Sequence, residues 1–423
     1  MVSLRGVPIP RRSAWRRVES PQRFRRGVLR AKGRVRVTLC RACGNTETEV
    51  IHEAPEVPVS SCVLVTSAQQ ALSFPRGDLR LSCCPNCGFI QNDLFRTDLV
   101  DYTHGYEESQ TGSATFRAFV DDVALDLIAR HRLGGKEVLE VGCGKGEWLA
   151  RICDLGQMYG VGIDPAYVPN RLPGELTRRF EVLREFYDDT HTDLTGDLIA
   201  CRHTLEHVGQ VREFATLLHT SALARPGSVT FVEVPDTERI LVEGAFWDIY
   251  YEHASYFTAE SLSRLFRSVG FTDVSVRKAY DGQYLLLEAR AGSRDPAGSR
   301  TEEGVADVLR RARAFSRSVG MKVDAWNALL ERRADRRVVV WGASSKAVGF
   351  LSALRESSII EYAIDINPMK HGRFLPGSGQ EIVPPEFLAE YRPDLVIVMN
   401  PIYRDEIGRN LDEMAVEAQI LVP

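Results

Sequence analysis

The stretch that decides the fold is "VLEVGCGKGEWL", residues 138–149 of a 423-residue chain. A run of branched apolar residues, typical of a buried strand, leads directly into Gly142, Gly144 and Gly146 and then into a helical pattern. Glycine permits a tight turn and lets the backbone approach a ligand closely. A strand, a glycine turn and a helix in this order are typical of doubly wound sheets that bind nucleotide-like cofactors.

The acidic residues around the turn indicate which cofactor it binds. Glu140 stands just before the glycines, where a carboxylate would repel a pyrophosphate but suits the ammonium and ribose of S-adenosylmethionine. Asp164 ends the next strand in "GVGIDP" and is placed to accept hydrogen bonds from ribose hydroxyls. S-adenosylmethionine is therefore the predicted cofactor, and NAD or a mere structural turn are the alternatives.

Two later segments extend this predicted site. "REFYDD" (184–189) is expected to supply the adenine environment, with Phe186 as its candidate. "CRHTLEHV" (201–208) follows another strand, at the edge where ligands bind in such sheets. His203, assigned here to the cofactor site, and its neighbours Glu206 and His207 either face the reaction or cap the following helix.

Alternation of strand-like and helical segments predicts an α/β architecture. The strands expected around the glycine turn are "EVLEV" (137–141), "YGVGI" (159–163), "DLIACR" (197–202) and "VTFVEV" (229–234). "DVSVRKAY" and "QYLLLEAR" read as an antiparallel hairpin, and "RVVVWGAS" begins a second, smaller α/β unit. The predicted parts are a basic, disordered tail (1–36), a Cys-rich zinc-binding domain (37–100), a Rossmann-like cofactor domain (101–292), a linker with a helix (293–334) and a C-terminal Rossmann-like domain (335–423).

Four of the nine cysteines form two C-x-x-C pairs, "CRAC" (40–43) and "CPNC" (84–87). Each pair places two thiolates one tight turn apart, as in a zinc knuckle, and four thiolates close a tetrahedral structural site. The predicted zinc ligands are Cys40, Cys43, Cys84 and Cys87. Cys83 is an alternative ligand, and unpaired buried cysteines are the other interpretation.

Charge and hydropathy exclude several classes of partner. Residues 1–36 hold twelve Lys and Arg against one acid, Glu19, so the remaining chain is mildly acidic. That balance argues against nucleic-acid binding by the body of the protein. The basic start lacks a secretory apolar region, and a transit peptide or a polyanion-binding arm are the alternatives to disorder. With no run of 18 apolar residues, we expect no membrane span and a cytoplasmic location.

"FWDIYYEHASYF" (246–257) places Glu252 and His253 side by side among six aromatic residues. With this segment included, residues 37–423 resemble the sugar C-methyltransferases, which act on nucleotide-linked 4-keto-deoxy sugars. The order of the parts agrees, as do "YYEH" with the family's Y-x-E-H element and "GASSKAVG" (342–349) and "DINPMKHGRFLPG" (365–377) with its C-terminal elements. His203, where the family carries Asn, and "MNPIYRDEI" (399–407) depart from the pattern and leave the exact sugar open.

The resemblance implies roles for the aromatic segment. His253 would remove the proton on the carbon beside the ketone, because a neutral imidazole is basic at working pH. Glu252 would orient its ring or hold the substrate, and Tyr250 would hydrogen-bond the developing enolate oxygen. Tyr106, in "YEESQ", would close the site. Tyr251 and Tyr256 are expected only to pack.

The C-terminal unit is expected to hold the substrate's pyrophosphate. Loop hydroxyls and cations are the candidates, namely Ser344, Ser345, Lys346, Lys370 and Arg373. The alternative is a unit that serves only as a lid. For the whole chain, the alternatives are an O- or N-methyltransferase of small molecules and a binding protein with an inactive methyltransferase fold.

Overall fold

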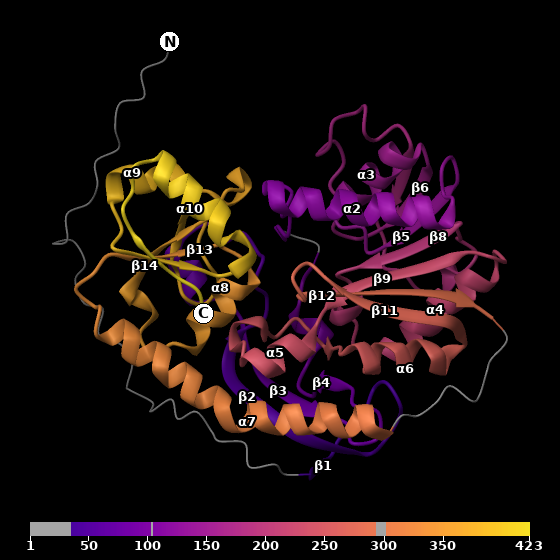
Figure 1. The fold of residues 1–423 in the computed structure, drawn as a ribbon, viewed down its shortest axis with the longest axis horizontal. Coiled ribbons are helices and arrows are strands. Elements are labelled where there is room, and N and C mark those ends of the chain that lie inside the picture. The colour runs from indigo at the N-terminus through magenta and orange to yellow at the C-terminus, as the bar shows by residue number, and fades with distance from the viewer. Residues whose placement is uncertain (1–34, 103–104, 293–301) are drawn as a thin grey trace.

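Figure 1 shows the computed structural model of the chain, which describes residues 35–102, 105–292 and 302–423. Three β-sheets organise these residues, one for each unit expected from the sequence. The predicted basic tail falls almost wholly within 1–34, and the start of the predicted linker within 293–301. Both segments lie outside the described residues.

The N-terminal sheet is antiparallel and has five strands in the order β1-β2-β3-β4-β10. Four come from the Cys-rich segment, and a short helix, α1 (Ala68–Leu72), connects two of them: β1 (Val35–Val37), β2 (Glu47–Pro58), β3 (Arg76–Cys83) and β4 (Ile90–Asn92). The fifth strand, β10 (Ser255–Tyr256), belongs to the aromatic segment and pairs with β4 through Ser255 opposite Gln91. The sequence gives no sign of this pairing, which anchors the "YYEH" loop to the N-terminal unit.

The central sheet has seven strands in the order β11-β12-β9-β8-β5-β6-β7. Its five parallel strands are β5 (Glu137–Val141), β6 (Tyr159–Ile163), β7 (Phe180–Leu183), β8 (Leu198–Arg202) and β9 (Val229–Pro235). β11 (Phe271–Ala279) and β12 (Tyr284–Ala291) form the predicted antiparallel hairpin, with β12 against β9. Because residues 138–141 are all buried, the strand that carries the glycine turn lies in the middle of the domain.

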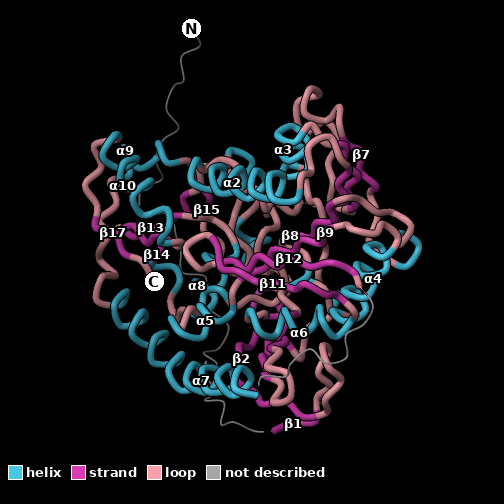
Figure 2. The backbone as a smooth tube through the Cα atoms, turned by 45° about the vertical axis from the view of Figure 1, so that its right-hand side comes forward, coloured by secondary structure: helices cyan, strands magenta, loops and turns pink. Residues whose placement is uncertain are grey.

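Helices cover both faces of the central sheet, as Figure 2 shows. α2 (Ala114–His131) and α3 (Glu147–Gly156) pack on one face, around Val138 and Leu198. α4 (Val211–Leu223) and α6 (Ala259–Val269) pack on the other, around Leu139 and Ile199. Successive strand residues therefore point to opposite cores, which explains the unbroken apolar runs. The predicted α/β fold is confirmed.

The C-terminal sheet is parallel throughout, in the order β15-β14-β13-β16-β17. Its strands are β13 (Val338–Trp341), β14 (Ile360–Ile364), β15 (Glu381–Val383), β16 (Leu395–Val398) and β17 (Gln419–Leu421), and its helices are α8 (Ser345–Ala353), α9 (Leu388–Tyr391) and α10 (Arg404–Glu413). A turn from β13 into α8 repeats the strand–turn–helix order of the central domain.

A long helix joins the units. α7 (Glu302–Glu331) runs along the lower edge of Figure 1, from beneath the N-terminal sheet to the C-terminal unit, and packs against α5 (Thr237–Glu243). Its buried Phe315 shares one core with Leu81 of β3, Trp247 and Phe350 of α8. The three units are thus held together by a common apolar core.

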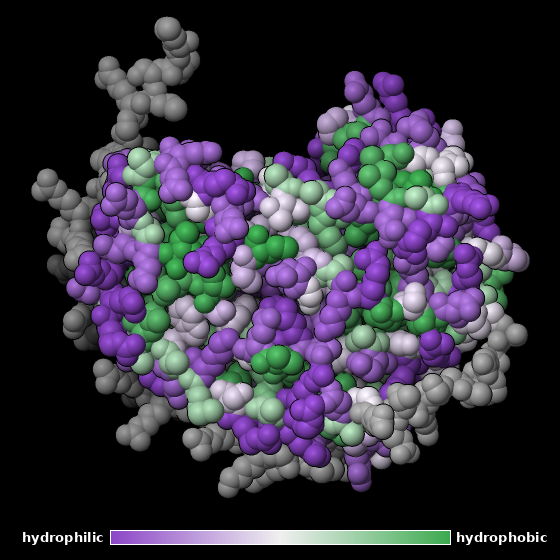
Figure 3. Space-filling model, viewed as in Figure 1, coloured by the Kyte–Doolittle hydropathy of each residue, from purple (hydrophilic) through white to green (hydrophobic). Residues whose placement is uncertain are grey.

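One face of the molecule is predominantly polar. On the face drawn in Figure 3, hydrophilic side chains predominate and apolar ones form separate small groups. Within the part of the chain that the structure describes, each helix is too short or too polar to cross a lipid bilayer.

Candidate active site and metal centre

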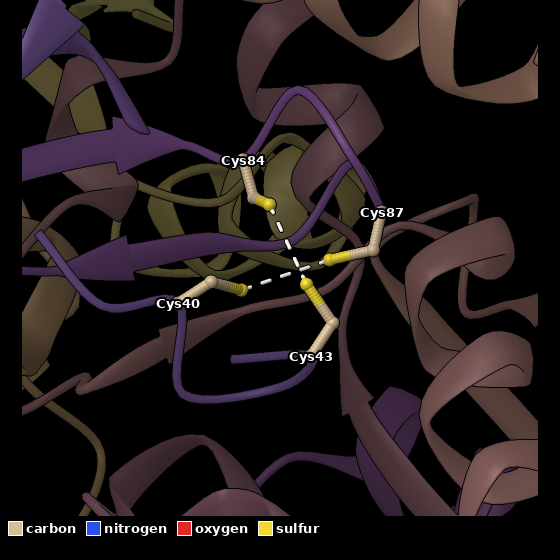
Figure 4. A group of neighbouring side chains, drawn as sticks. All are labelled: Cys40, Cys43, Cys84 and Cys87. Atoms are coloured by element: carbon tan, nitrogen blue, oxygen red, sulfur yellow. Dashed lines mark hydrogen bonds between the residues drawn. The ribbon is translucent and has the colours of Figure 1, made fainter. Parts of the chain in front are cut away.

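The two C-x-x-C pairs come together in the N-terminal unit (Figure 4), one in the loop between β1 and β2 and the other in the loop between β3 and β4. The Sγ atoms of Cys40 and Cys87 are 3.7 Å apart, as are those of Cys43 and Cys84. Tetrahedral zinc with Zn–S bonds of about 2.3 Å requires about 3.8 Å between sulfurs, so the four thiols fit this ion closely. Cys83 points elsewhere and is buried outside the cluster.

Each knuckle is closed by backbone hydrogen bonds, and both contact the central domain. Gly44 N–H donates to the Cys40 carbonyl at 2.8 Å, and Gly88 N–H donates to the Cys84 carbonyl at 2.9 Å. Arg212 of α4 donates to the Ala42 carbonyl at 2.9 Å. The cluster therefore holds β4 beside the helices on one face of the central sheet. Because β10 pairs with β4, its position is held as well.

The glycine turn lies at the carboxyl end of β5. Gly142 N–H donates to the Ile163 carbonyl at 2.8 Å and has φ +74°, a conformation that favours glycine. A Cβ at Gly142 would lie 2.0 Å from Thr204 Oγ1, so neither the backbone nor the space admits a side chain. Gly144 and Gly146 complete the turn at the start of α3.

Two predicted acids flank this turn, and they differ in their hydrogen bonding. Asp164 accepts hydrogen bonds from Gly144 N–H at 2.8 Å and Ala166 N–H at 2.7 Å. Glu140 is 2% exposed, and its Oε2 has no hydrogen-bond partner. Burial, partly offset by Arg202, raises the pKa of Glu140 to about 8. A buried carboxylate with an unused oxygen fits a cationic ligand, and the ammonium and sulfonium of S-adenosylmethionine are cations.

A third carboxylate converges on the turn. Glu108 Oε2 lies 3.8 Å from Lys145 Nζ and is buried without a hydrogen-bond partner. Burial raises the pKa of Glu108 to about 7. Phe186, the predicted adenine contact, is 64% exposed and lines the cavity above the turn.

His203 follows β8 in a left-handed conformation, with φ +49°. Its Nε2 lies 2.9 Å from Glu233 Oε1, and its Nδ1 lies 3.6 Å from Glu206 Oε1. Burial lowers the pKa of His203, but the two carboxylates outweigh burial and raise it to about 9. The ring is therefore an imidazolium held between two acids. Glu233, which also pairs with Arg202, has no sequence pattern that marks it.

The aromatic segment encloses His253. The centroid of its ring lies 4.4 Å from that of Tyr250, at an interplanar angle of 66°, and 4.8 Å from that of His207, at 88°. No hydrogen bond reaches this ring from the described residues. Burial, and then the neighbouring His207, lowers the pKa of His253 well below its usual range, so the imidazole is neutral at physiological pH. Tyr251 and Tyr256 pack in the core, with hydroxyls bonded to backbone carbonyls.

Glu252 points away from the His253 ring toward the N-terminal unit. Its carboxylate accepts hydrogen bonds from the hydroxyls of Ser61 and, at 3.3 Å, of Ser60 and Tyr106. Ser61 N–H also donates to it at 3.2 Å. Tyr106 thus contacts Glu252, and its role in closing the site stays a prediction. The two serines carry no signal in the sequence, because only the fold brings them to this loop.

The basic candidates of the C-terminal unit already have partners. Lys346 forms an ion pair with buried Asp248, which also pairs with Arg239. Lys370 Nζ donates to the Ala343 carbonyl at 3.0 Å and to Asp365 Oδ2 at 3.1 Å. Ser344 and Ser345 stand with both lysines along the cavity, and the Ser345 hydroxyl lies 2.8 Å from the Ser61 hydroxyl. Arg373 does not line the cavity.

A single cavity of about 1430 Å³ runs between the units. Sites for one small molecule commonly occupy about 300–1,000 Å³, so this space admits a cofactor and a second ligand together. The structure brings most of the predicted residues to its wall: Tyr106, Glu140, Gly142, Gly144, Asp164, Phe186, His203, Tyr250, His253, Ser344, Lys346 and Lys370.

Comparison with known proteins identifies the class of enzyme. Residues 116–276 match the family described as methyltransferase domain, and residues 300–423 match the C-methyltransferase C-terminal domain. The protein is a methyltransferase. The methyltransferase is 28% identical over 408 residues to C-methyltransferase NovU of Streptomyces niveus, covering 88% of this chain and 92% of that one. These matches confirm the predicted resemblance to C-methyltransferases and support S-adenosylmethionine as the cofactor.

Two solved methyltransferase structures are similar to part of the chain. One is the 1,6-didemethyltoxoflavin-N1-methyltransferase of Burkholderia thailandensis, with 18% identity, a TM-score of 0.34, and coverage of 43% of this chain and 83% of that one. The other is the magnesium protoporphyrin IX methyltransferase of Synechocystis PCC 6803, with 18% identity, a TM-score of 0.34, and coverage of 45% and 91%.

Proposed function

We propose that this methyltransferase transfers a methyl group to the carbon beside the ketone of a nucleotide-linked 4-keto-deoxy sugar. The match of residues 300–423 to the C-methyltransferase C-terminal domain supports transfer to carbon. A cavity of about 1430 Å³, which reaches from the glycine turn to the C-terminal unit, has room for the cofactor and a substrate of this size.

Bound S-adenosylmethionine supplies an electrophilic methyl group on a sulfonium. Glu140 would pair with the ammonium of the cofactor, and Asp164 would face its ribose. The backbone of the turn from Gly142 to Gly146 would lie against the cofactor. Phe186 would cover the adenine. His203 would act near the methyl group as a fixed imidazolium, because its ring is already held by Glu233 and Glu206.

The observation that carries the proposal is the neutral His253 ring in the cavity wall, free of hydrogen bonds from the described residues. A sugar carbon becomes a nucleophile only as an enolate, so a base must remove the proton beside the ketone. His253 would accept this proton, and the Tyr250 hydroxyl would donate to the developing enolate oxygen. The aromatic rings exclude water that would reprotonate the carbon.

Other residues would hold these groups in place. Glu252, bound by Ser60, Ser61 and Tyr106, would fix the "YYEH" loop rather than orient the imidazole directly. Ser344 and Lys346 would contact the substrate's pyrophosphate from the start of α8, with Lys370 and Arg373 nearby on the same unit. A structural zinc in the Cys cluster would hold β4, and through it β10.

Deuterium exchange tests the base. In D₂O, without cofactor, the enzyme should exchange the proton beside the ketone of a nucleotide-linked 4-keto sugar. His253→Ala should slow this exchange and methyl transfer at least ~100-fold, because general bases contribute about 10²–10⁴ in rate. Its dissociation constant for S-adenosylmethionine should stay within about twofold.

Two outcomes would contradict this mechanism. Exchange that survives in His253→Ala would exclude His253 as the base. Methyl transfer without any exchange in the wild type would favour an O- or N-methyltransferase, the alternative function. Tyr251→Phe is the matched control, because it removes a phenol from the same segment whose hydroxyl bonds to the backbone of Leu94 and Arg96, away from the cavity wall.

A further inference from the structure

A second group of metal-ligating side chains lies within the cavity. Glu206, His207 and His253 each offer one ligand atom, and these atoms lie within 4.8 Å of one another. Glu206 and His207 come from the short turn η4 (Leu205–His207) after β8. His253 comes from the loop before β10, so the group forms only when the N-terminal sheet holds that loop beside the central sheet.

Each member of this Glu-His-His group has an unused ligand atom. Glu206 is 2% exposed, and its Oε2 has no hydrogen-bond partner, although its Oε1 faces the His203 imidazolium. His207 Nδ1 lies 3.1 Å from the Glu252 carbonyl. The Tyr102 hydroxyl also lies 3.1 Å from this nitrogen. In the tautomer whose Nδ1–H donates to the Glu252 carbonyl, Nε2 keeps a lone pair. The His253 ring makes no hydrogen bond with the described residues.

This arrangement has the chemistry of a transition-metal site. Two imidazoles and one carboxylate are a frequent ligand set for Zn²⁺ in which water takes the fourth position. A ligating histidine commonly donates its other N–H to a backbone carbonyl, as His207 does to Glu252. The cavity supplies a path for the ion, since all three residues line it.

We infer that Glu206, His207 and His253 bind Zn²⁺, and that the bound ion inhibits the enzyme by occupying the imidazole that serves as the base. Binding of the ion stands on the geometry of the three side chains alone. Inhibition rests on the proposed function, because a nitrogen that ligates zinc has no lone pair left for a proton.

Cobalt and zinc titrations of the full-length protein test the two parts separately. Co²⁺ should bind in two equivalents per chain, one with the intense absorption of thiolate ligation at the Cys cluster and one with the weak visible bands of nitrogen and oxygen ligands. With the Cys cluster loaded, a further equivalent of Zn²⁺ should lower deuterium exchange at least ~10-fold. A mild chelator that leaves the thiolate band intact should restore it.

Matched variants locate the second ion. Glu206→Gln and His207→Gln should weaken the second equivalent about 10–100-fold and leave the thiolate band unchanged. His131→Gln, which removes an imidazole outside the cavity wall, should bind both equivalents normally. One equivalent only, or a second one that neither variant at Glu206 or His207 weakens, would overturn the site. Zinc that leaves exchange unchanged or accelerates it would overturn the inhibition, while an enzyme without any exchange would count against the proposed function and leave the cobalt result readable.

Discussion

The central and C-terminal sheets each contain a glycine turn with the same backbone hydrogen bonds, but the charged side chains around the two turns differ. Gly142 N–H donates to the Ile163 carbonyl at 2.8 Å, and Gly342 N–H donates to the Ile364 carbonyl at 2.8 Å. At the end of the following strand, Asp164 and Asp365 each accept one N–H from the turn and one from the residue two positions further along the chain.

The charges around the two turns differ. In the C-terminal turn, Lys370 Nζ lies 3.1 Å from Asp365, and Val340 stands where the central turn has Glu140. In the central turn, Glu140 keeps an unpaired buried oxygen. The same backbone therefore carries a buried carboxyl with an unpaired oxygen in one unit and a carboxylate paired with a lysine in the other. The geometry of the turn is shared, and the charged groups beside it differ.

The glycines give the largest expected contrast. Gly142→Ala would place Cβ 2.0 Å from Thr204 Oγ1 at a φ of +74°, so it should lower the free energy of unfolding by about 3 kcal/mol and weaken S-adenosylmethionine at least ~100-fold. At Gly342 the nearest atom to a Cβ is 3.6 Å away, so Gly342→Ala should cost about 1 kcal/mol and leave cofactor affinity unchanged. Urea unfolding and calorimetric titration measure both. Equal losses of stability and of cofactor affinity in the two variants would mean that both turns contribute equally to binding the cofactor.

Lys370→Met tests charge compensation in the second turn. It leaves Asp365 buried beside two amides without its cation, which should destabilise the protein by about 3 kcal/mol. Thermal and urea unfolding should show the loss, with the dissociation constant of S-adenosylmethionine unchanged. Met369→Leu, at an exposed neighbour, is the control. A cofactor affinity that fell with Lys370→Met would show that the units are energetically coupled.

Glu140 makes cofactor binding depend on pH. With a pKa of about 8 in the empty site, its carboxyl is mostly protonated at pH 7, and a cationic ligand favours the ionised form. Affinity for S-adenosylmethionine should therefore rise with pH, up to about tenfold per unit, and level off above about pH 8. Calorimetry from pH 6 to 9 measures this slope. Glu140→Gln should bind about tenfold more weakly at pH 8.5 and lose most of the dependence; a retained slope would point to Glu108 instead.

The smallest effect is expected at Phe186. Its side chain is 64% exposed, so covering the adenine gains little. Phe186→Ala should weaken S-adenosylmethionine only about twofold to fivefold, measured by the same titration. A loss of affinity as large as that of Glu140→Gln would mean that the Phe186 ring moves to cover the bound cofactor and becomes far less exposed.

Local pattern was enough to predict much of this protein. The strand and glycine turn at 138–149, the two C-x-x-C pairs and the alternation of strands and helices are properties of short segments, set by side-chain period and by the freedom of glycine. "EVLEV" and "YGVGI" were predicted to the residue as β5 and β6. β7 and β15 are not predicted, because both are edge strands and neither carries the run of branched apolar residues that marks β13 and β16.

Only the tertiary structure decided which residues surround the reactive imidazole. Residues far apart in sequence interact there, such as Ser61 with Glu252 and Lys346 with Asp248. The pairing of β10 with β4 turns Glu252 away from the ring that sequence adjacency suggested it would orient. Glu252 lies in a turn before β10 and is bound by Ser60 and Ser61 of the N-terminal unit, so its adjacency to His253 in sequence does not bring the two groups together. Sequence determined which chemical groups are present, and the packing of three sheets determined which of them keep an unused lone pair.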